Sequence, residues 1–231
     1  MNRIVVPRFA GLACLVLSMP GLLFGQMSYA ADLENGEEIN EVCGGCHGPL
    51  GQGGKQGEYP RLAGQPKDFI SYQLHLFRDR KRPNMAMIEY IDDRQMPDAD
   101  IEDISAYLAA IDLPSKLAPV DVNAPGFNAY ERLLETKRIV QIPRAEGDIK
   151  AGGKIYRKEC ASCHGRDGKG DSEKAVPMLT GQYTNYLWRQ VDKLLKGVRV
   201  HDLEEPDEEL LADFSHEEIR DIFAWVSIAD D

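Results

Sequence analysis

Two pentapeptides of the sequence contain residues that could hold a cofactor covalently. CGGCH at 43–47 and CASCH at 160–164 both match C-x-x-C-H, the attachment pattern of c-type haem. Two thiols three residues apart can each add to one of the two vinyl groups of a haem, and the adjacent histidine then reaches the iron as its proximal ligand. The sequence therefore predicts two covalent haems. The attaching cysteines are Cys43, Cys46, Cys160 and Cys163, and the ligating histidines are His47 and His164.

The same cysteine spacing also serves zinc sites and redox-active dithiols. A zinc site usually places its second ligand pair a dozen or so residues further on, whereas here the second motif follows 117 residues later. A thioredoxin-like dithiol would need one motif in a βαβ setting, not two copies in glycine-rich loops. Haem attachment is therefore the favoured interpretation.

The first thirty residues are typical of an export signal. Arg3 and Arg8 precede an almost wholly apolar stretch at 9–24, and small residues that a signal peptidase recognises end at Ala30. An uncleaved membrane anchor is the alternative, but the apolar stretch is short for a membrane span. We expect cleavage after Ala30, no stable membrane insertion afterwards, and a periplasmic location.

Cysteine usage and charge fit such a protein. Of the five cysteines, Cys14 lies in the signal and the other four lie in the two motifs, so no disulfide can form once both haems are attached. Removal of the signal leaves 25 basic and 38 acidic residues, hence a net charge of −13. Nucleic acids and anionic membranes are poor partners for this charge, whereas redox proteins with basic docking surfaces are suitable ones.

The chain is a duplication. Shifting the sequence by 117 residues aligns the two motifs, the glycines that follow them, and the loops that end at Gln65 and Gln182. With the signal peptide at 1–30, the matches predict a first domain at 31–113 and a second domain at 148–231. The residues between them, 114–147, form a linker in which we expect a short helix.

Hydrophobic periodicity predicts an all-α fold. We expect helices at 34–42, 67–80, 151–159 and 184–196, and further helices that begin after Pro97 and after Ser215. In the linker, apolar residues at helical spacing around Tyr130 predict a short helix that packs across the two domains. Each domain is small for a self-sufficient apolar core, so the haem should supply much of it.

These residues resemble the di-haem cytochrome c4 family. The resemblance rests on the paired C-x-x-C-H-G motifs, on YPRLAGQ at 59–65 with VPMLTGQ at 176–182, and on the helix that leads to Phe77 and Arg78. It implies two class I cytochrome c domains in tandem, each a few short helices around a haem. It also implies single-electron transfer between respiratory partners such as a quinol-oxidising complex, a terminal oxidase or a dehydrogenase.

The resemblance also implies roles for particular residues. A glycine of the first helix of each domain should meet an aromatic residue of the last helix. These pairs would be Gly36 with Tyr107 and Gly153 with Trp225. The carbonyl groups of Pro60 and Pro177 should accept hydrogen bonds from the two proximal histidines.

The sixth iron ligand differs between the two copies. In the family pattern a methionine about forty residues after the haem histidine closes the far side of the iron, which favours Met87 over Met85 and Met96. Glu204 stands at the corresponding place in the second domain. His201 is the nearest strong ligand there, and an open iron or ligation by Met178 are the alternatives.

Two functional hypotheses follow. The first is an electron carrier without catalytic activity of its own, which needs only two haems close together and a transient docking surface. The second is a catalytic di-haem cytochrome, or a subunit of an oxidoreductase, that acts on peroxide or sulfur compounds at an open iron in the second domain.

Overall fold

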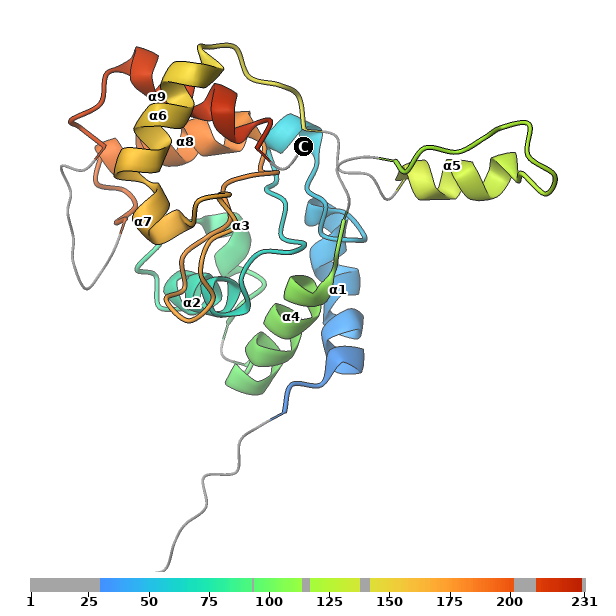
Figure 1. Ribbon diagram of the computed structural model, residues 1–231. Helices are drawn as coiled ribbons and strands as arrows, with labels where there is room; N and C mark the ends of the chain where they lie inside the picture. The colour runs from blue at the N-terminus through green and yellow to red at the C-terminus, as the bar shows by residue number, and fades with distance from the viewer. Residues whose placement is uncertain (1–29, 93, 114–116, 138–141, 202–210, 230–231) are drawn as a thin grey trace, which may run out of the picture. The chain divides into compact units, whose positions relative to one another are not determined.

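The computed structural model describes residues 30–92, 94–113, 117–137, 142–201 and 211–229 (Figure 1). Within these ranges the chain is helical and contains no strand, only two isolated β-bridges, Gly54 with Tyr59 and Asp171 with Val176. No helix in this part of the chain has the length and apolar character needed to cross a membrane. The elements are α1 (Leu33–His47), the 3-10 helix η1 (Lys55–Gly57), α2 (Lys67–Arg78), α3 (Met85–Ile88), α4 (Asp98–Ala110), α5 (Ala129–Lys137), α6 (Ile149–Glu159), α7 (Ala161–His164), α8 (Thr184–Leu195) and α9 (His216–Val226). The predicted all-α class is confirmed.

The helix that carries each motif begins at an aspartate cap. Asp32 accepts the backbone N–H groups of Glu34 and Asn35 at the start of α1, and Asp148 caps α6 in the same way. The helix expected at 34–42 is longer than predicted, because α1 continues through the whole first motif. In the second copy a break at Cys160 separates α6 from the short helix α7 that carries the motif.

The first and last helices of each copy pack against each other, α1 with α4 and α6 with α9 (Figure 1), and a glycine lies at each contact. A Cβ on Gly36 would lie 2.6 Å from Tyr107 Cβ, and one on Gly153 would lie 2.6 Å from Trp225 Cδ1. The two predicted glycine–aromatic crossings are therefore present. The closest approach in the second copy is at Gly152, which sequence reasoning did not single out. A Cβ there would be 1.8 Å from the backbone oxygen of Asp221.

In each copy a buried aspartate on the last helix binds the backbone of the residue that caps the first helix. Asp103 Oδ1 accepts the backbone N–H of Asp32 at 2.7 Å, and Asp221 Oδ1 accepts that of Asp148 at 2.9 Å. These charge-assisted bonds fix where each motif-bearing helix starts relative to the helix that it crosses. They join the same helices as the glycine contacts, α1 with α4 and α6 with α9.

The apolar cores differ between the copies. In the second copy one cluster joins α6, α8 and α9, with Tyr156, Leu187 and Phe223 among its buried members. In the first copy the buried apolar residues form three separate clusters around Phe77, Ala63 and Ile104. Neither core is large, which agrees with the expectation that a cofactor completes each of them.

The linker helix corrects one expectation. α5 forms where a helix was predicted, but its apolar residues do not pack across the two domains. Tyr130 is 66% exposed and Leu133 52% exposed. The segment is held by local bonds instead, because Asn128 caps the helix and Arg132 donates to the carbonyl oxygen of Ala118.

Candidate haem-binding sites

The two motif histidines are buried and held in one orientation. His47 is 8% exposed at the end of α1, and His164 is 9% exposed at the end of α7. Nδ1 of each ring lies 3.0 Å from a proline carbonyl oxygen, that of Pro60 for His47 and that of Pro177 for His164. A carbonyl oxygen can only accept, so Nδ1 carries the proton and Nε2 keeps its lone pair for a metal ion.

The environment also keeps both rings neutral. Burial lowers the pKa of His47, against the opposing effect of its bond to Pro60. Burial lowers the pKa of His164 to about 4, and the nearby His201 and Arg199 contribute to the decrease. A neutral imidazole is the form that ligates iron, so both histidines are ready to bind near neutral pH.

The four motif cysteines precede these histidines in the chain. Cys46 and Cys163 are exposed, whereas Cys43 and Cys160 are partly buried. Burial raises the pKa of Cys43, and burial with the charges of Glu159 and Cys163 raises the pKa of Cys160 to about 11. Burial thus disfavours the thiolate form of Cys43 and Cys160, and a thioether bond to haem would place no charge at these two partly buried positions.

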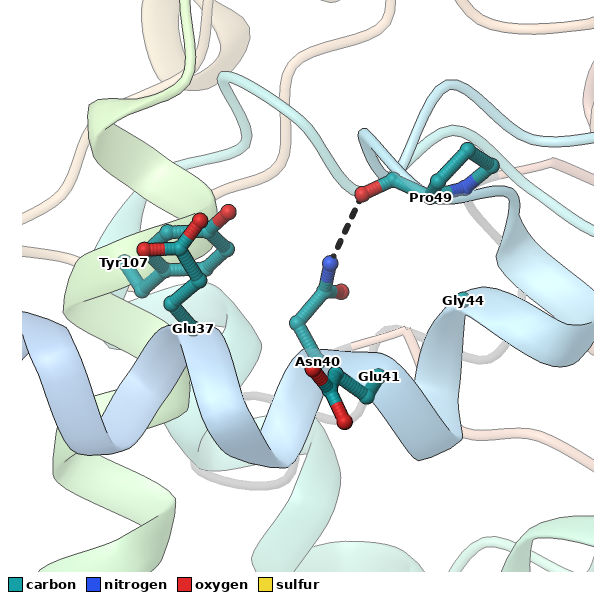
Figure 2. Close-up of a pocket in the computed structure, with 6 residues that line it drawn as sticks. All are labelled: Glu37, Asn40, Glu41, Gly44, Pro49 and Tyr107. Carbon is teal, nitrogen blue, oxygen red and sulfur yellow. Dashed lines mark hydrogen bonds between the residues drawn. The ribbon is translucent and has the colours of Figure 1, made fainter.

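The loops after the motifs repeat the same hydrogen bonds in both copies. Gly53 donates to the carbonyl oxygen of His47, and Gly170 donates to that of His164. In the first copy the Asn40 amide also donates to Pro49 O at 2.9 Å across a small surface pocket between α1 and α4, as Figure 2 shows. Together these bonds hold the chain that follows each histidine against the motif helix.

A pair of reciprocal glutamine contacts joins the two copies. The Gln65 side chain accepts the N–H of Met178 and donates to its carbonyl oxygen, both at 3.0 Å. The Gln182 side chain makes the same two bonds to the backbone of Arg61, both at 2.9 Å. Both glutamines are 3% exposed. The repeat had aligned these residues without predicting a contact between the domains, although a polar residue retained at the same position in both copies was a usable signal.

Two partly buried arginines lie where the copies meet. Arg82 donates to Gln73, Gln190 and the hydroxyl of Tyr186, and Arg199 donates to Gln190. Burial lowers the pKa of Arg199 to about 10, and the charge of Arg82 adds to this decrease. Within the described ranges neither guanidinium forms an ion pair with a carboxylate. Guanidinium groups that are partly removed from water favour anionic partners, so this donor set suits the propionate carboxylates that a haem carries.

The candidate sixth ligands lie in different settings. Met87 in α3 is partly buried against the cluster around Phe77, whereas Met85 is 66% exposed and Met96 is a buried core residue, 7% exposed. In the second copy the His201 ring centroid lies 6.2 Å from that of His164, with an angle of 71° between the ring planes. Glu204 lies outside the described residues.

Met178 is placed differently from His201. Its backbone directly follows Pro177, the acceptor for His164, and is held there by Gln65. It therefore belongs to the loop on the proximal side of the histidine.

Two neutral, carbonyl-oriented histidines, each next to a cysteine pair and each in a small helical domain, define a c-type cytochrome with two haems. The chain belongs to the cytochrome c family, whose model matches residues 33–112 and 149–228. The predicted membership in the di-haem cytochrome c4 family, the tandem fold and the two covalent haems are thereby confirmed, and the protein carries electrons as a di-haem cytochrome.

The relatives extend over both domains. Cytochrome c4 of Pseudomonas aeruginosa is 28% identical over 204 residues, which cover 87% of this chain and 86% of the relative. The thiosulfate dehydrogenase electron acceptor of Stutzerimonas stutzeri is 28% identical over 194 residues, or 84% of this chain and 81% of the relative. The crystal structure of reduced recombinant cytochrome c4 from Pseudomonas stutzeri has the same fold, with a TM-score of 0.66, 23% identity, and coverage of 85% of this chain and 98% of that one.

Proposed function

We propose that this di-haem cytochrome is an exported periplasmic carrier of single electrons, with one His/Met haem and one bis-histidine haem. The observation that carries the proposal is the pairing of two complete haem-binding copies through buried contacts of Gln65 and Gln182. A haem supplies reversible one-electron chemistry when it is bound. The protein then has to orient the proximal ligands, exclude water and keep the two sites close to each other, and the described contacts do this.

The proposed ligands of the first haem are His47 and Met87. Met87 is partly buried next to the apolar cluster of the first copy, so its thioether can be held away from water. Met85 is 66% exposed and thus largely open to water, and Met96 is already a packed core residue between α2 and α4. The position of Met87, forty residues after His47, supports the same choice.

The proposed ligands of the second haem are His164 and His201. Each ring would hold the iron through a nitrogen, and the two ring centroids lie 6.2 Å apart, a distance that one metal ion bound to both with bonds of about 2 Å could span.

The separation alone would not select His201, because the Tyr59 ring lies 6.1 Å from His47. Tyr59 directly precedes Pro60 and thus belongs to the proximal loop. His201 instead follows α8, in the part of the repeat that corresponds to the approach to Met87. The chain position and the spacing together support His201.

The partners of such a carrier are redox proteins with basic docking surfaces. The chain has a formal net charge of −11, and six of its acidic residues fall within 202–209, which lie outside the described residues. Complementary charge accelerates transient encounters, which suits a protein that must bind and release two partners in turn. A quinol-oxidising complex, a terminal oxidase or a dehydrogenase could fill these roles. The name of the Stutzerimonas relative, an electron acceptor of thiosulfate dehydrogenase, supports a dehydrogenase as one donor.

The experiment that tests this proposal examines ligand binding at the second haem. Ferric wild-type protein should show two low-spin species by electron paramagnetic resonance, and the reduced protein should not bind carbon monoxide. His201→Ala should convert one haem to a high-spin form that binds carbon monoxide, whereas His75→Ala, a change at a histidine on α2, should leave both spectra unchanged.

The catalytic alternative makes the opposite prediction for the wild type. An enzyme that acts on peroxide or sulfur compounds at the second haem needs an iron position open to its substrate. A wild-type protein that already contains a high-spin haem and binds carbon monoxide would contradict ligation by His201 and favour that alternative.

A further inference from the structure

Each glutamine contact between the copies ends on the peptide group that holds the proximal histidine of the other copy. The Pro60–Arg61 peptide accepts the His47 Nδ1–H at its oxygen, 3.0 Å away, and donates its N–H to Gln182 Oε1, 2.9 Å away. The Pro177–Met178 peptide does the same between His164 and Gln65, with both distances 3.0 Å.

The two bonds on one peptide group reinforce each other. When the N–H donates to a strong acceptor, the amide becomes more polarised and its carbonyl oxygen becomes a better acceptor. The histidine Nδ1–H is then held more strongly, and more electron density moves to the side of the ring that faces the metal. Both glutamines are buried at 3% exposure, so water does not screen this effect.

We propose that each glutamine sets the reduction potential of the haem in the opposite domain. Gln182 of the second copy acts on the first haem through Arg61 N, Pro60 O and His47, and Gln65 of the first copy acts on the second haem through Met178 N, Pro177 O and His164. The inference rests on the proposed function, because it concerns the potentials of an electron carrier. The two glutamines are positioning residues, since neither contacts a proximal histidine directly.

The direction of the effect follows from the chemistry. A more electron-rich imidazole stabilises ferric iron relative to ferrous iron and therefore lowers the potential. Loss of a glutamine acceptor should weaken the histidine bond and raise the potential of the opposite haem. The amide also holds the two loops together through its second bond, from Nε2 to the carbonyl oxygen of Arg61 or Met178. The same side chain thus joins the domains and connects their redox centres.

The test is a potentiometric titration of the holo-protein with the two haems followed separately by their ferric resonance signals. Gln182→Leu should favour the ferrous form of the first haem by about three- to tenfold, which raises its potential by about 30 to 60 mV. The potential of the second haem should not change. Gln65→Leu should do the same to the second haem only. The proton resonance of the Nδ1–H of the affected histidine should move with the potential, which a purely structural role would not require.

Glutamate variants separate the acceptor from the donor. Gln182→Glu and Gln65→Glu keep an oxygen that accepts the peptide N–H but lose the amide that donates to the carbonyl oxygen. Each should keep the potential of the opposite haem at the wild-type value or below it, although the loops have lost one bond.

The outcomes that overturn the inference are distinct. A leucine variant that shifts the haem of its own domain, shifts both haems equally, or shifts neither would contradict the crossed connection while leaving the carrier function intact. Failure of the wild type to show two reversible one-electron steps would instead contradict the proposed function itself.

Discussion

Gly152→Ala should destabilise the second haem domain more than any surface substitution, because α6 and α9 cross with backbone against backbone at this position. The added Cβ would lie 1.8 Å from the oxygen and 2.1 Å from the carbonyl carbon of Asp221, where ordinary contact begins at 3.4 Å. No side chain can rotate away to relieve this contact, so the helices must separate. Overpacking of this kind costs about 3 kcal/mol, which corresponds to a decrease in Tm of about 10 to 20 °C for a domain of this size.

The assay is thermal unfolding of the holo-protein, followed by the absorbance of each haem. The second haem should report unfolding at the lower temperature, and the first haem should keep its wild-type transition. Gly45→Ser is the matched control, because a Cβ at Gly45 meets nothing within 4 Å and the second copy has Ser162 at the same place. A Gly152→Ala protein with the Tm of Gly45→Ser would refute the reasoning that this crossing determines the position of α6, and with it that of the second motif.

Two further predictions concern ligation and docking. Met87→Ala should abolish the weak near-infrared band of methionine-ligated ferric haem and leave the second haem unchanged. Loss of that band in Met85→Ala or Met96→Ala instead would move the ligand within the same segment. Electron exchange with a basic redox partner should slow steeply as the salt concentration rises, because salt screens the acidic surface. A rate that does not depend on ionic strength would show that docking is apolar.

The parts of the fold that could be predicted are those with a local chemical signal. The C-x-x-C-H motifs specified the haem attachment sites and the candidate proximal ligands, and helical periodicity placed α2 and α8 within two residues of their observed ends. The proline carbonyl groups at Pro60 and Pro177 accept from the histidines as the family resemblance implied. These features depend on residues close together in the sequence or on a repeated pattern.

The contacts that could not be predicted join residues far apart in the chain. Gln65 and Met178 are 113 residues apart, and Arg61 and Gln182 are 121 apart, so no local pattern connects them. Gly152 was missed because it contacts a backbone oxygen. Every residue has this atom, so the type of the facing residue does not indicate the contact. The exposure of α5 was missed because an amphipathic pattern predicts a helix without identifying what covers its apolar face.

The duplication made two similar sites, and some differences between the copies bear on the relative potentials of their haems. Arg61, at 6% exposure, places a buried cation in the proximal loop of the first haem, where the second has Met178 at the corresponding position. A nearby cation disfavours ferric iron, and a thioether ligand such as Met87 does the same relative to an imidazole such as His201. With the proposed ligands, both differences raise the potential of the first haem relative to the second, whereas the charge of Arg199 near His164 acts in the opposite sense. We expect the ligand difference to dominate, so that an electron entering at the second domain moves downhill to the first. The glutamine contacts are the same in both directions, so they do not by themselves make the two potentials differ.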